Sequence, residues 1–345
     1  MTVDRAAFLR RAGIGAAGVS LGSLLDPAAA LAGDGGGDFP AHPRWRFVFV
    51  SYDTLDPLDV ATQFGAQDAA ALVRCTTQWT GSPSGSVDET VKAFRAALAG
   101  KADGIAATLV DRAAFGADLD AAHKAEVPVV AFGFDSGGGQ GRVAYIGESP
   151  YSAGLRAGAE IARLIPGGGA LVFAPESPQP WVDRRLEGVV AGLARSSKPA
   201  RPTVVRLAGF QKQQQTEVQD ALKNRPDARG LVAVDGDGTL AVGTVVKQLG
   251  LAAKGVHAAG FDLLPTGYAL ISEGHLDFAV DKQAYVQGYA AVMQLFLARI
   301  SEGTVFPWDA ETSVLLRKDD VQRLVQTKSR FEGSSSRHEY PLRRG

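Results

Sequence analysis

Side chains that can hold a polyhydroxylated molecule recur where apolar, β-rich runs of this sequence end. Nearly every run is followed by an acid, an amide, a base or a large aromatic side chain, and the candidates are Tyr52, Asp53, Trp79, Asp135, Trp181, Arg185, Phe210, Gln211, Asp237, Asp262 and Lys282. Carboxylates accept hydrogen bonds from hydroxyl groups, and arginine and lysine donate to them. Flat aromatic rings cover the apolar C–H face of a sugar ring. An aspartate at a strand end is as often a turn or helix cap as a ligand contact, so the prediction of a sugar or polyol site rests on the repetition.

The apolar runs alternate with longer amphipathic stretches along almost the whole chain. Strands are predicted at 46–51, 104–108, 128–132, 170–174, 203–207, 230–234, 256–261 and 278–280. Helices are predicted at 57–72, 87–99, 113–125, 152–165, 181–196, 213–224, 239–249 and 284–300. This alternation is typical of parallel, doubly wound α/β sheets covered on both faces. Ligands of such sheets bind at the carboxyl ends of the strands, where the candidate residues stand.

Composition excludes several functional classes. The 345 residues allow about two domains of roughly 150 residues each. With 36 basic and 37 acidic side chains the net charge is −1, which argues against a nucleic-acid partner, since such proteins usually carry a basic face. Cys75 is the one cysteine, so no intramolecular disulfide can form, and five scattered histidines predict no zinc site.

Motifs of the common enzyme classes are absent from the sequence. There is no phosphate-binding G-x-x-x-x-G-K-[ST] loop and no G-x-S-x-G nucleophile elbow. The segment 236–241 matches the weak G-x-G-x-x-A pattern, but the acid that binds the ribose about 20 residues further on is missing. Asp237 within it would also repel a pyrophosphate. We therefore predict no catalytic residue, cofactor or metal, and interpret Cys75 as a small core residue.

The two ends of the chain have the character of an export signal and a tail. A basic start is followed by 14 apolar residues (12–25) and a small-residue triplet, which predicts a signal peptide at 1–32 cleaved before Gly33. The stretch 4–10 resembles a degenerate twin-arginine signal in which Ala6 replaces the second arginine, so the Tat and Sec routes both stay open. Residues 33–43 are predicted to be a loose leader and 328–345 a disordered tail.

A family resemblance follows from motifs between about residues 44 and 325. In order, the chain carries the runs QWTG, KADGIAATLVD, EVPVVAFGFDS, YIGES, RRLEG, LVAVDGDGT, AAGFDLLP and GHLDFAVDKQAYVQG. With them the chain resembles the type I periplasmic sugar-binding proteins of ABC importers, the ribose- and galactose-binding group. The resemblance implies an α/β fold of two doubly wound parallel-sheet lobes joined by a three-segment hinge. It places one lobe at 44–147 plus 283–302, the other at 148–282 plus 303–327, and the crossovers near 146–148, 281–283 and 300–303.

The resemblance also implies roles for candidates in the first lobe. Tyr52 and Asp53 would touch the sugar from the first loop. Trp79 would lie against the sugar ring, as an aromatic residue does in some family members. Asp135 would accept hydrogen bonds from two hydroxyl groups.

In the second lobe the resemblance implies three charged contacts. Arg185 would donate to ring or hydroxyl oxygens, although its neighbour Arg184 is equally placed to face inward. Asp262 matches the family's second-lobe aspartate, and Asp237 stands where Asn or Asp is usual.

The remaining candidates are less tightly matched to the family. Phe210 or Gln211 would fill a wall position, and Trp181 would add a second stacking face. Lys282 departs from the pattern, because a hinge glutamine is common there. This lysine could donate to a ligand, or only pair with Asp281 or Asp262.

The resemblance implies an exported protein, periplasmic or at the cell surface, that captures a sugar or polyol by hinge closure. It would be a monomer that delivers its ligand to the membrane permease of an ABC importer. Two alternatives stay open: a secreted carbohydrate-active enzyme, which needs a paired acid and base, and a ligand-loaded sensor for a membrane receptor. Pentoses, hexoses, polyols, inositol, a furanosyl signal and, because of Lys282, a sugar acid all remain possible ligands.

Overall fold

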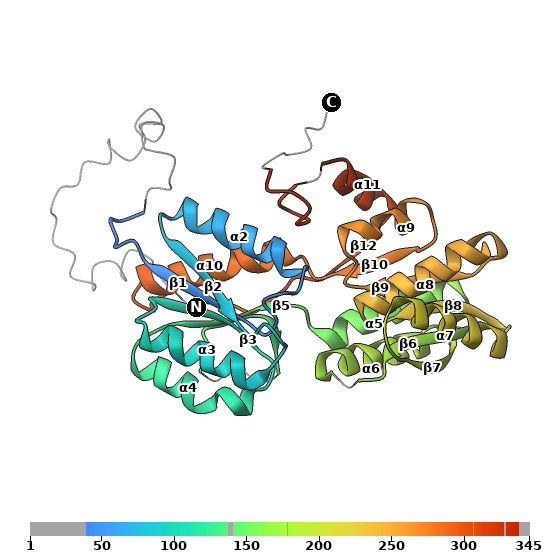
Figure 1. Ribbon diagram of the computed structural model, residues 1–345, viewed down its shortest axis with the longest axis horizontal. Coiled ribbons are helices and arrows are strands. Elements are labelled where there is room, and N and C mark those ends of the chain that lie inside the picture. The colour runs from blue at the N-terminus through green and yellow to red at the C-terminus, as the bar shows by residue number, and fades with distance from the viewer. Residues whose placement is uncertain (1–38, 137–140, 178, 306, 328, 338–345) are drawn as a thin grey trace, which may run out of the picture. The chain divides into compact units, whose positions relative to one another are not determined.

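The computed structural model describes residues 39–136, 141–177, 179–305, 307–327 and 329–337. Within these ranges the chain forms two six-stranded sheets (Figure 1). The predicted signal peptide at 1–32 and the leader up to residue 38 lie outside the described residues. No helix within those ranges combines the length and apolar character that crossing a membrane requires.

The first sheet and its helices form what we call the first lobe. Its strands lie in the order β11-β5-β4-β3-β1-β2 and pair in parallel. Their bounds are β1 Arg46–Ser51, β2 Thr76–Gly81, β3 Gly104–Leu109, β4 Val129–Asp135, β5 Ala144–Gly147 and β11 Ala310–Glu311. The helices are α2 Asp59–Leu72, α3 Val87–Ala99, α4 Arg112–Lys124 and α10 Ala284–Ile300.

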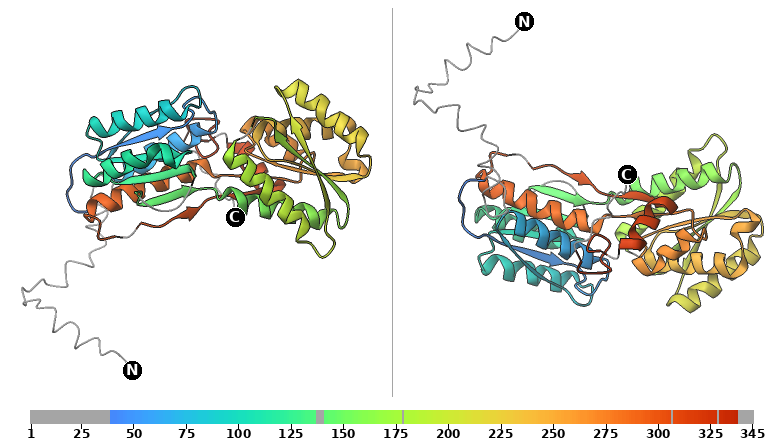
Figure 2. Two further views of the ribbon diagram at one scale, coloured as in Figure 1. Left: turned by 90° about the horizontal axis from the view of Figure 1, so that it is seen from below. Right: turned by 90° about the horizontal axis from the view of Figure 1, so that it is seen from above.

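Helices cover both faces of this sheet, as the continuous apolar strands predict (Figure 2). Successive side chains of β1 point to opposite faces. Phe47 and Phe49 are therefore buried in one cluster with residues of α2 and α10, while Val48 and Val50 are buried in another with residues of α3 and α4.

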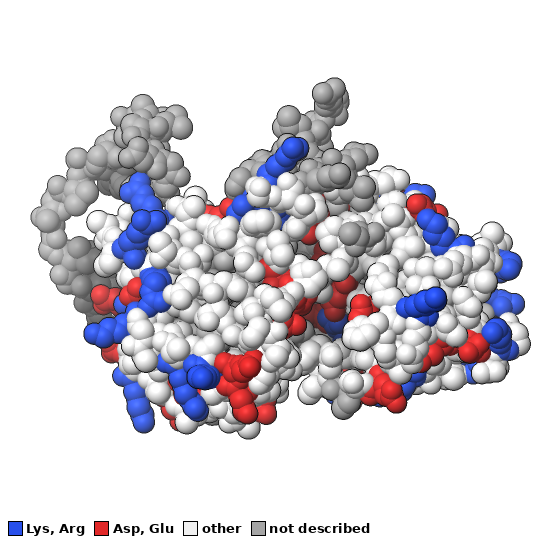
Figure 3. Space-filling view, in the orientation of Figure 1, with Lys and Arg blue, Asp and Glu red and all other residues white. Residues whose placement is uncertain are grey.

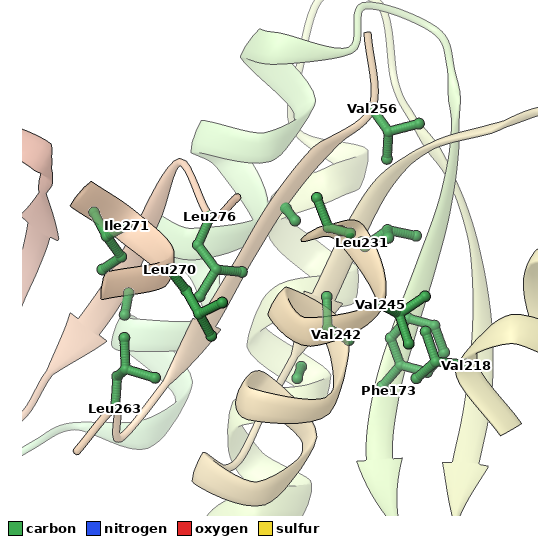
Figure 4. Packing of buried hydrophobic residues seen from close by; sticks show 14 of the residues in the cluster. Phe173, Val218, Leu231, Val242, Val245, Val256, Leu263, Leu270, Ile271 and Leu276 are labelled. Atoms are coloured by element: carbon green, nitrogen blue, oxygen red, sulfur yellow. The ribbon is translucent and has the colours of Figure 1, made fainter. Parts of the chain in front are cut away.

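The second sheet and its helices form the second lobe. Its strands lie in the order β12-β10-β9-β8-β6-β7, and only β12 runs antiparallel to its neighbour. Their bounds are β6 Gly169–Pro175, β7 Arg201–Leu207, β8 Ala228–Ala233, β9 His257–Phe261, β10 Phe278–Asp281 and β12 Val314–Arg317. The helices are α5 Pro150–Leu164, α6 Pro180–Ala194, α7 Gln211–Asn224, α8 Gly236–Leu249, α9 Tyr268–Ser272 and α11 Lys318–Thr327. Figure 4 shows part of its core, where Val245 of α8 lies beside Phe173 and Val218.

Local sequence signals account for where several helices begin. Ser86 caps α3 by accepting a hydrogen bond from the backbone N–H of Glu89, and Asp111 caps α4 in the same way. α5 and α6 each begin with a proline, whose missing N–H costs nothing in the first turn.

Glycines allow the α5–α6 helix pair of the second lobe to pack in close contact. A Cβ atom at Gly154 would lie 2.2 Å from the carbonyl oxygen of Arg185, and one at Gly158 would lie 2.1 Å from that of Val189. A side chain at either position would push the helices apart. Because Arg185 lies on this interface, the glycines also set its depth in the lobe.

The chain passes between the two sheets three times. The first passage follows β5 at Glu148, and the second follows β10 at Lys282. The third lies between β11 and β12, whereas the family resemblance implied a position near 300–303. The difference arises because β11 pairs with β5 through Ala310 and Glu311, which keeps the chain with the first sheet up to that point. A two-residue strand has no hydrophobic period from which it could be predicted.

The α/β fold class is confirmed, and the eight predicted strands and eight predicted helices are all present. β2, β5, β11, β12, α9 and α11 were not predicted, since they are short or largely polar. The predicted disordered tail at 328–345 is wrong for 329–337. There Ser329 and Arg330 are buried, and Arg330 forms an ion pair with Asp68 of α2.

Candidate functional site

A cavity of about 400 Å³ lies among the carboxyl ends of strands from both sheets and the second passage. Tyr52 and Asp53 reach it from the end of β1, and Asp235 and Asp262 from the ends of β8 and β9. Its polar lining residues are Ser51, Tyr52, Asp53, Asp56, Asp59, Thr108, Gln179, Gln211, Asp235, Asp237, Asp262 and Lys282. Acidic side chains also gather in the hollowed middle of the face shown in Figure 3.

Aromatic side chains form one wall of the cavity. The ring of Trp181 stacks on that of Phe134 with centroids 4.5 Å apart and meets Tyr52 edge-on at 5.7 Å. Trp181 belongs to the second lobe and the other two to the first, so this wall spans both lobes. Phe134 was not among the predicted site residues. It directly precedes the predicted Asp135, and the alternation of side chains along β4 is the signal that could have identified it.

Lys282 carries the positive charge on the cavity wall. Its Nζ lies 3.9 Å from Asp56 Oδ2 and 3.9 Å from Asp59 Oδ1. Burial by itself lowers the pKa of Lys282, but the carboxylates of Asp56, Asp59 and Asp262 together raise it above its ordinary value. The lysine is therefore charged and already surrounded by acids. Of the two partners expected for Lys282, Asp262 is close enough to raise its pKa. The two ion pairs of Lys282 are with Asp56 and Asp59, which the sequence analysis did not single out.

Asp59 is a buried carboxylate that sequence reasoning missed. Its Oδ2 accepts a hydrogen bond from Ser51 Oγ at 2.7 Å. Burial raises its pKa to about 6, although the charge of Lys282 opposes that shift. An aspartate in the first turn of a helix is ordinarily a surface residue, so the sequence carried no signal for it.

Asp262 is held from behind by Arg185. Arg185 donates to both carboxylate oxygens, with Nη2 3.2 Å from Oδ1 and Nη1 bonded to Oδ2. Burial alone would raise the pKa of Asp262, but the guanidinium holds it below its ordinary value. Asp262 also has a positive φ of 53°, in the left-handed region, which turns the chain at the end of β9. The carboxylate on the cavity wall is therefore ionised and fixed.

Two further aspartates line the cavity beyond the end of β8. Burial raises the pKa of Asp235 to about 6, and the neighbouring Asp237 and Asp262 raise it further. Asp237 is exposed and lies two residues along, in the first turn of α8. Both carboxylates add hydrogen-bond acceptors to the second-lobe side.

The structure brings together most of the predicted site residues. Those on the cavity wall are Tyr52, Asp53, Trp181, Gln211, Asp237, Asp262 and Lys282. Their contact with a ligand stays a prediction.

Four predicted residues do not line the cavity. Trp79 is partly buried and packs against the core residues Phe49 and Phe132, at 5.6 and 5.7 Å between ring centroids. Asp135 is held by Arg142, whose Nε lies 2.5 Å from Oδ2.

The other two predicted residues lie at a different depth from the one expected. Phe210 stands at the N-cap position of α7 and is 84% exposed, while its neighbour Gln211 reaches the cavity. Arg185 is only 1% exposed and contacts Asp262 where a sugar oxygen was expected, while Arg184 lies outside, paired with Glu187.

This arrangement suits a neutral molecule with many hydroxyl groups and one apolar face. Six carboxyl groups and Gln211 offer acceptors, Lys282 offers a donor, and the aromatic wall offers a flat surface. In the part of the chain that the structure describes, no group of His, Cys, Asp and Glu side chains is placed to hold a metal ion.

Comparison of the sequence with known proteins finds similarity to binding proteins. A model of the periplasmic binding protein domain matches residues 47–300. The xylose/arabinose-binding protein XylF of Sulfolobus acidocaldarius is 31% identical over 319 residues, covering 87% of this chain and 77% of that protein.

Solved structures show the same fold. The glucose-galactose binding protein GanP of Geobacillus stearothermophilus has a TM-score of 0.68 at 23% identity, covering 81% of this chain and 99% of that one. A carbohydrate transporter from Acidothermus cellulolyticus 11B, in complex with myo-inositol, has a TM-score of 0.67 at 25% identity, covering 82% and 98%.

Proposed function

Because this chain belongs to the periplasmic binding protein family, as a type I sugar-binding protein of an ABC importer, we propose that its acidic cavity captures a neutral sugar or polyol. The family resemblance predicted from the sequence is confirmed. The chain is accordingly a solute-binding protein and not an enzyme.

The lining of the cavity is the single observation that supports this ligand class. Carboxylates are its main polar groups, and they accept hydrogen bonds from hydroxyls. Trp181, Phe134 and Tyr52 offer an apolar surface for the C–H face of a ring. Charged acceptors make hydrogen bonds about twice as strong as neutral ones, which suits tight capture from dilute solution.

The charge balance argues against sugar acids. The charge of Lys282 is already balanced by Asp56, Asp59 and Asp262, so an added carboxylate would meet a net negative cavity. We expect pentoses to bind best, since XylF is a xylose/arabinose-binding protein and the two chains align over most of their lengths.

Capture requires the two lobes to close on the ligand. Trp181 and Tyr52 touch across the lobes, and candidate contacts come from both, so rotation about the three passages would enclose a bound ring. The closed protein would then be recognised by the membrane permease. A receptor that senses the loaded protein is the alternative partner.

The family consists of exported binding proteins. We propose in addition that residues 1–32 direct export by the Tat or Sec route, that cleavage precedes Gly33, and that the protein works as a monomer in the periplasm or at the cell surface.

A ligand panel tests the proposal. The chain from Gly33 is titrated calorimetrically and melted with D-xylose, L-arabinose, D-glucose, D-galactose, myo-inositol and D-galacturonate. A ligand at a hundredfold excess over its Kd stabilises the folded state by about 2.7 kcal/mol. We expect a clear shift with a neutral sugar, which is recovered unchanged. Galacturonate as the best ligand would contradict the charge argument, and no binding by any neutral sugar or polyol would contradict the proposed ligand class.

A further inference from the structure

Glu148 lies where the chain first leaves the first sheet, directly after β5. The residue is only 1% exposed, and its Oε1 accepts a hydrogen bond from Arg185 Nε at 2.6 Å. Tyr145 Oη donates to its backbone carbonyl at 2.6 Å, which fixes the main chain at the passage. Among the described residues, Glu148 Oε2 has no hydrogen-bond partner.

Arg185 connects this passage to the cavity. It donates to Glu148 on one side and to Asp262 on the other, and its Nη1 also donates to the Val234 carbonyl at 3.2 Å. Its guanidinium carbon lies 4.7 Å from the centre of the Phe261 ring. Of Glu148, Arg185 and Asp262, only Asp262 reaches the cavity wall.

A buried group of two acids and one base is costly to desolvate and gives little net stability. Burial raises the pKa of Glu148, although the Arg185 guanidinium opposes that shift. Packing alone therefore does not explain why a carboxyl group stands at this position. Without the Glu148 carboxylate, the Arg185 guanidinium keeps its hydrogen bonds to Asp262 but loses the acceptor of its Nε–H.

We propose that Glu148 is a positioning residue, which acts through Arg185 to aim the Asp262 carboxylate at the ligand and so couples ligand contact to the first passage. This inference rests on the proposed function. Asp262 and the first passage move together. Rotation of the lobes therefore also repositions the Asp262 carboxylate that contacts the ligand.

A double-mutant cycle tests this role. Kd for D-xylose and L-arabinose is measured for wild type, Glu148→Gln, Asp262→Asn and the double variant. We expect Glu148→Gln to raise Kd about tenfold, and to have no further effect once Asp262 is Asn. Glu187→Gln, on the exposed side of α6, is the matched control and should leave Kd unchanged. A Kd within twofold of wild type in Glu148→Gln, with Asp262→Asn impaired, would overturn the inference.

A second readout needs no ligand. The Arg185 Nε–H proton should exchange slowly in the wild type and at least tenfold faster in Glu148→Gln. If the wild type binds no sugar, the proposed ligand class fails and this exchange rate decides the positioning role alone. An unchanged rate would contradict it.

A separate observation concerns residues 329–334, which we call the strap. Arg330 is 8% exposed and donates to both carboxylate oxygens of Asp68, at 2.8 and 3.1 Å. Its guanidinium lies 4.2 Å from the centre of the Phe64 ring. Phe331 meets the ring of Tyr285 edge-on at 4.8 Å. All these partners belong to α2 and α10 of the first lobe.

The helix before the strap belongs to the second lobe. Val321 of α11 is fully buried in the cluster that contains Ile271, Leu276 and Leu316. Only two residues separate the end of α11 at Thr327 from Arg330. Since consecutive Cα atoms are 3.8 Å apart, the Cα atoms of Thr327 and Arg330 stay within about 11 Å of each other. Figure 2 shows this red segment reaching from α11 toward α2.

The geometry points to the strap as a fourth link between the lobes, one that limits how far they separate and can be released because it is not covalent. Its anchor is a bidentate ion pair with a cation–π contact, both largely shielded from water. Wide opening would have to break this anchor or pull α11 from its lobe.

Distances between spin labels test the strap without any ligand. Labels are attached at Lys124→Cys in α4 and Lys223→Cys in α7, both exposed. We expect Arg330→Ala, and a chain ended after Thr327, to lengthen and broaden the distance distribution. Arg323→Ala, exposed on α11, is the matched control. Distributions identical to wild type in both folded variants would overturn the strap.

Discussion

Lys282 and Asp59 join the second passage to the first lobe, with the lysine Nζ 3.9 Å from Asp59 Oδ1. The two residues are 223 positions apart in the sequence. Both are largely buried, and each affects the charge state of the other. Because this contact lies at the cavity wall, it links stability, pH and ligand binding.

Asp59→Asn should flatten the pH dependence of stability. Burial raises the pKa of Asp59 to about 6, so between about pH 4 and 6 the folded protein holds a proton that the unfolded chain releases. The resulting stabilisation is complete below about pH 4 and is lost as the pH rises through 6. Two pKa units correspond to about 3 kcal/mol. Urea unfolding at pH 4.5 and 7.5 measures the difference, which should shrink in the variant. If the difference in unfolding free energy between the two pH values is unchanged in the variant, another group causes it, and Asp235 is the next candidate.

Lys282→Gln should destabilise the protein above pH 6 by about 1–3 kcal/mol, because Asp56, Asp59 and Asp262 would lose their shared cation. The loss should be smaller at pH 4.5, where Asp59 is protonated. Urea unfolding at both pH values measures this effect. Lys247→Gln, which breaks only an exposed pair with Glu273, is the control and should cost less than about 0.5 kcal/mol. Equal losses for the two variants would refute a buried role for Lys282.

Trp181→Ala should raise the Kd of a sugar ligand about 10–100-fold, since the aromatic wall loses its central ring. Calorimetry measures the affinity. The tryptophan fluorescence change on binding should also largely disappear. Trp308→Phe provides the comparison, because Trp308 is 59% exposed and does not line the cavity. A fluorescence change that persists in Trp181→Ala but vanishes in Trp308→Phe would contradict the assignment.

Gln211→Ala and Phe210→Ala should have opposite outcomes although they are neighbours. Gln211 lines the cavity, so its loss should weaken sugar binding about 3–10-fold, the value of one hydrogen bond. Phe210 is exposed, and its loss should leave Kd unchanged. Titration of both variants with the same sugar decides which residue forms the wall. Weakened binding in Phe210→Ala alone would reverse the assignment.

Much of the fold could be predicted from local patterns, because a strand such as β1 is apolar on both faces and each βα unit repeats. The position of Tyr52 and Asp262 on the cavity wall could be predicted because parallel strands end at one edge. Arg185 had the right residue type and helix, but its depth depends on glycines in α5 and α6 that let the helices approach. Contacts between distant segments, such as Lys282 with Asp59, leave no local pattern.

The order of elements in the first lobe has a consequence for how the protein folds during synthesis. Phe49 and Phe132 are made early, but they are buried against Leu295 and Phe296 of α10, which are made after the whole parallel part of the second sheet. The second lobe can bury most of its core from one continuous stretch, whereas the first must wait for non-local contacts, which form slowly. Domains usually fold in the order of their synthesis. Here the lobe that is begun first should be the last to become native, with its aromatic residues exposed in the meantime.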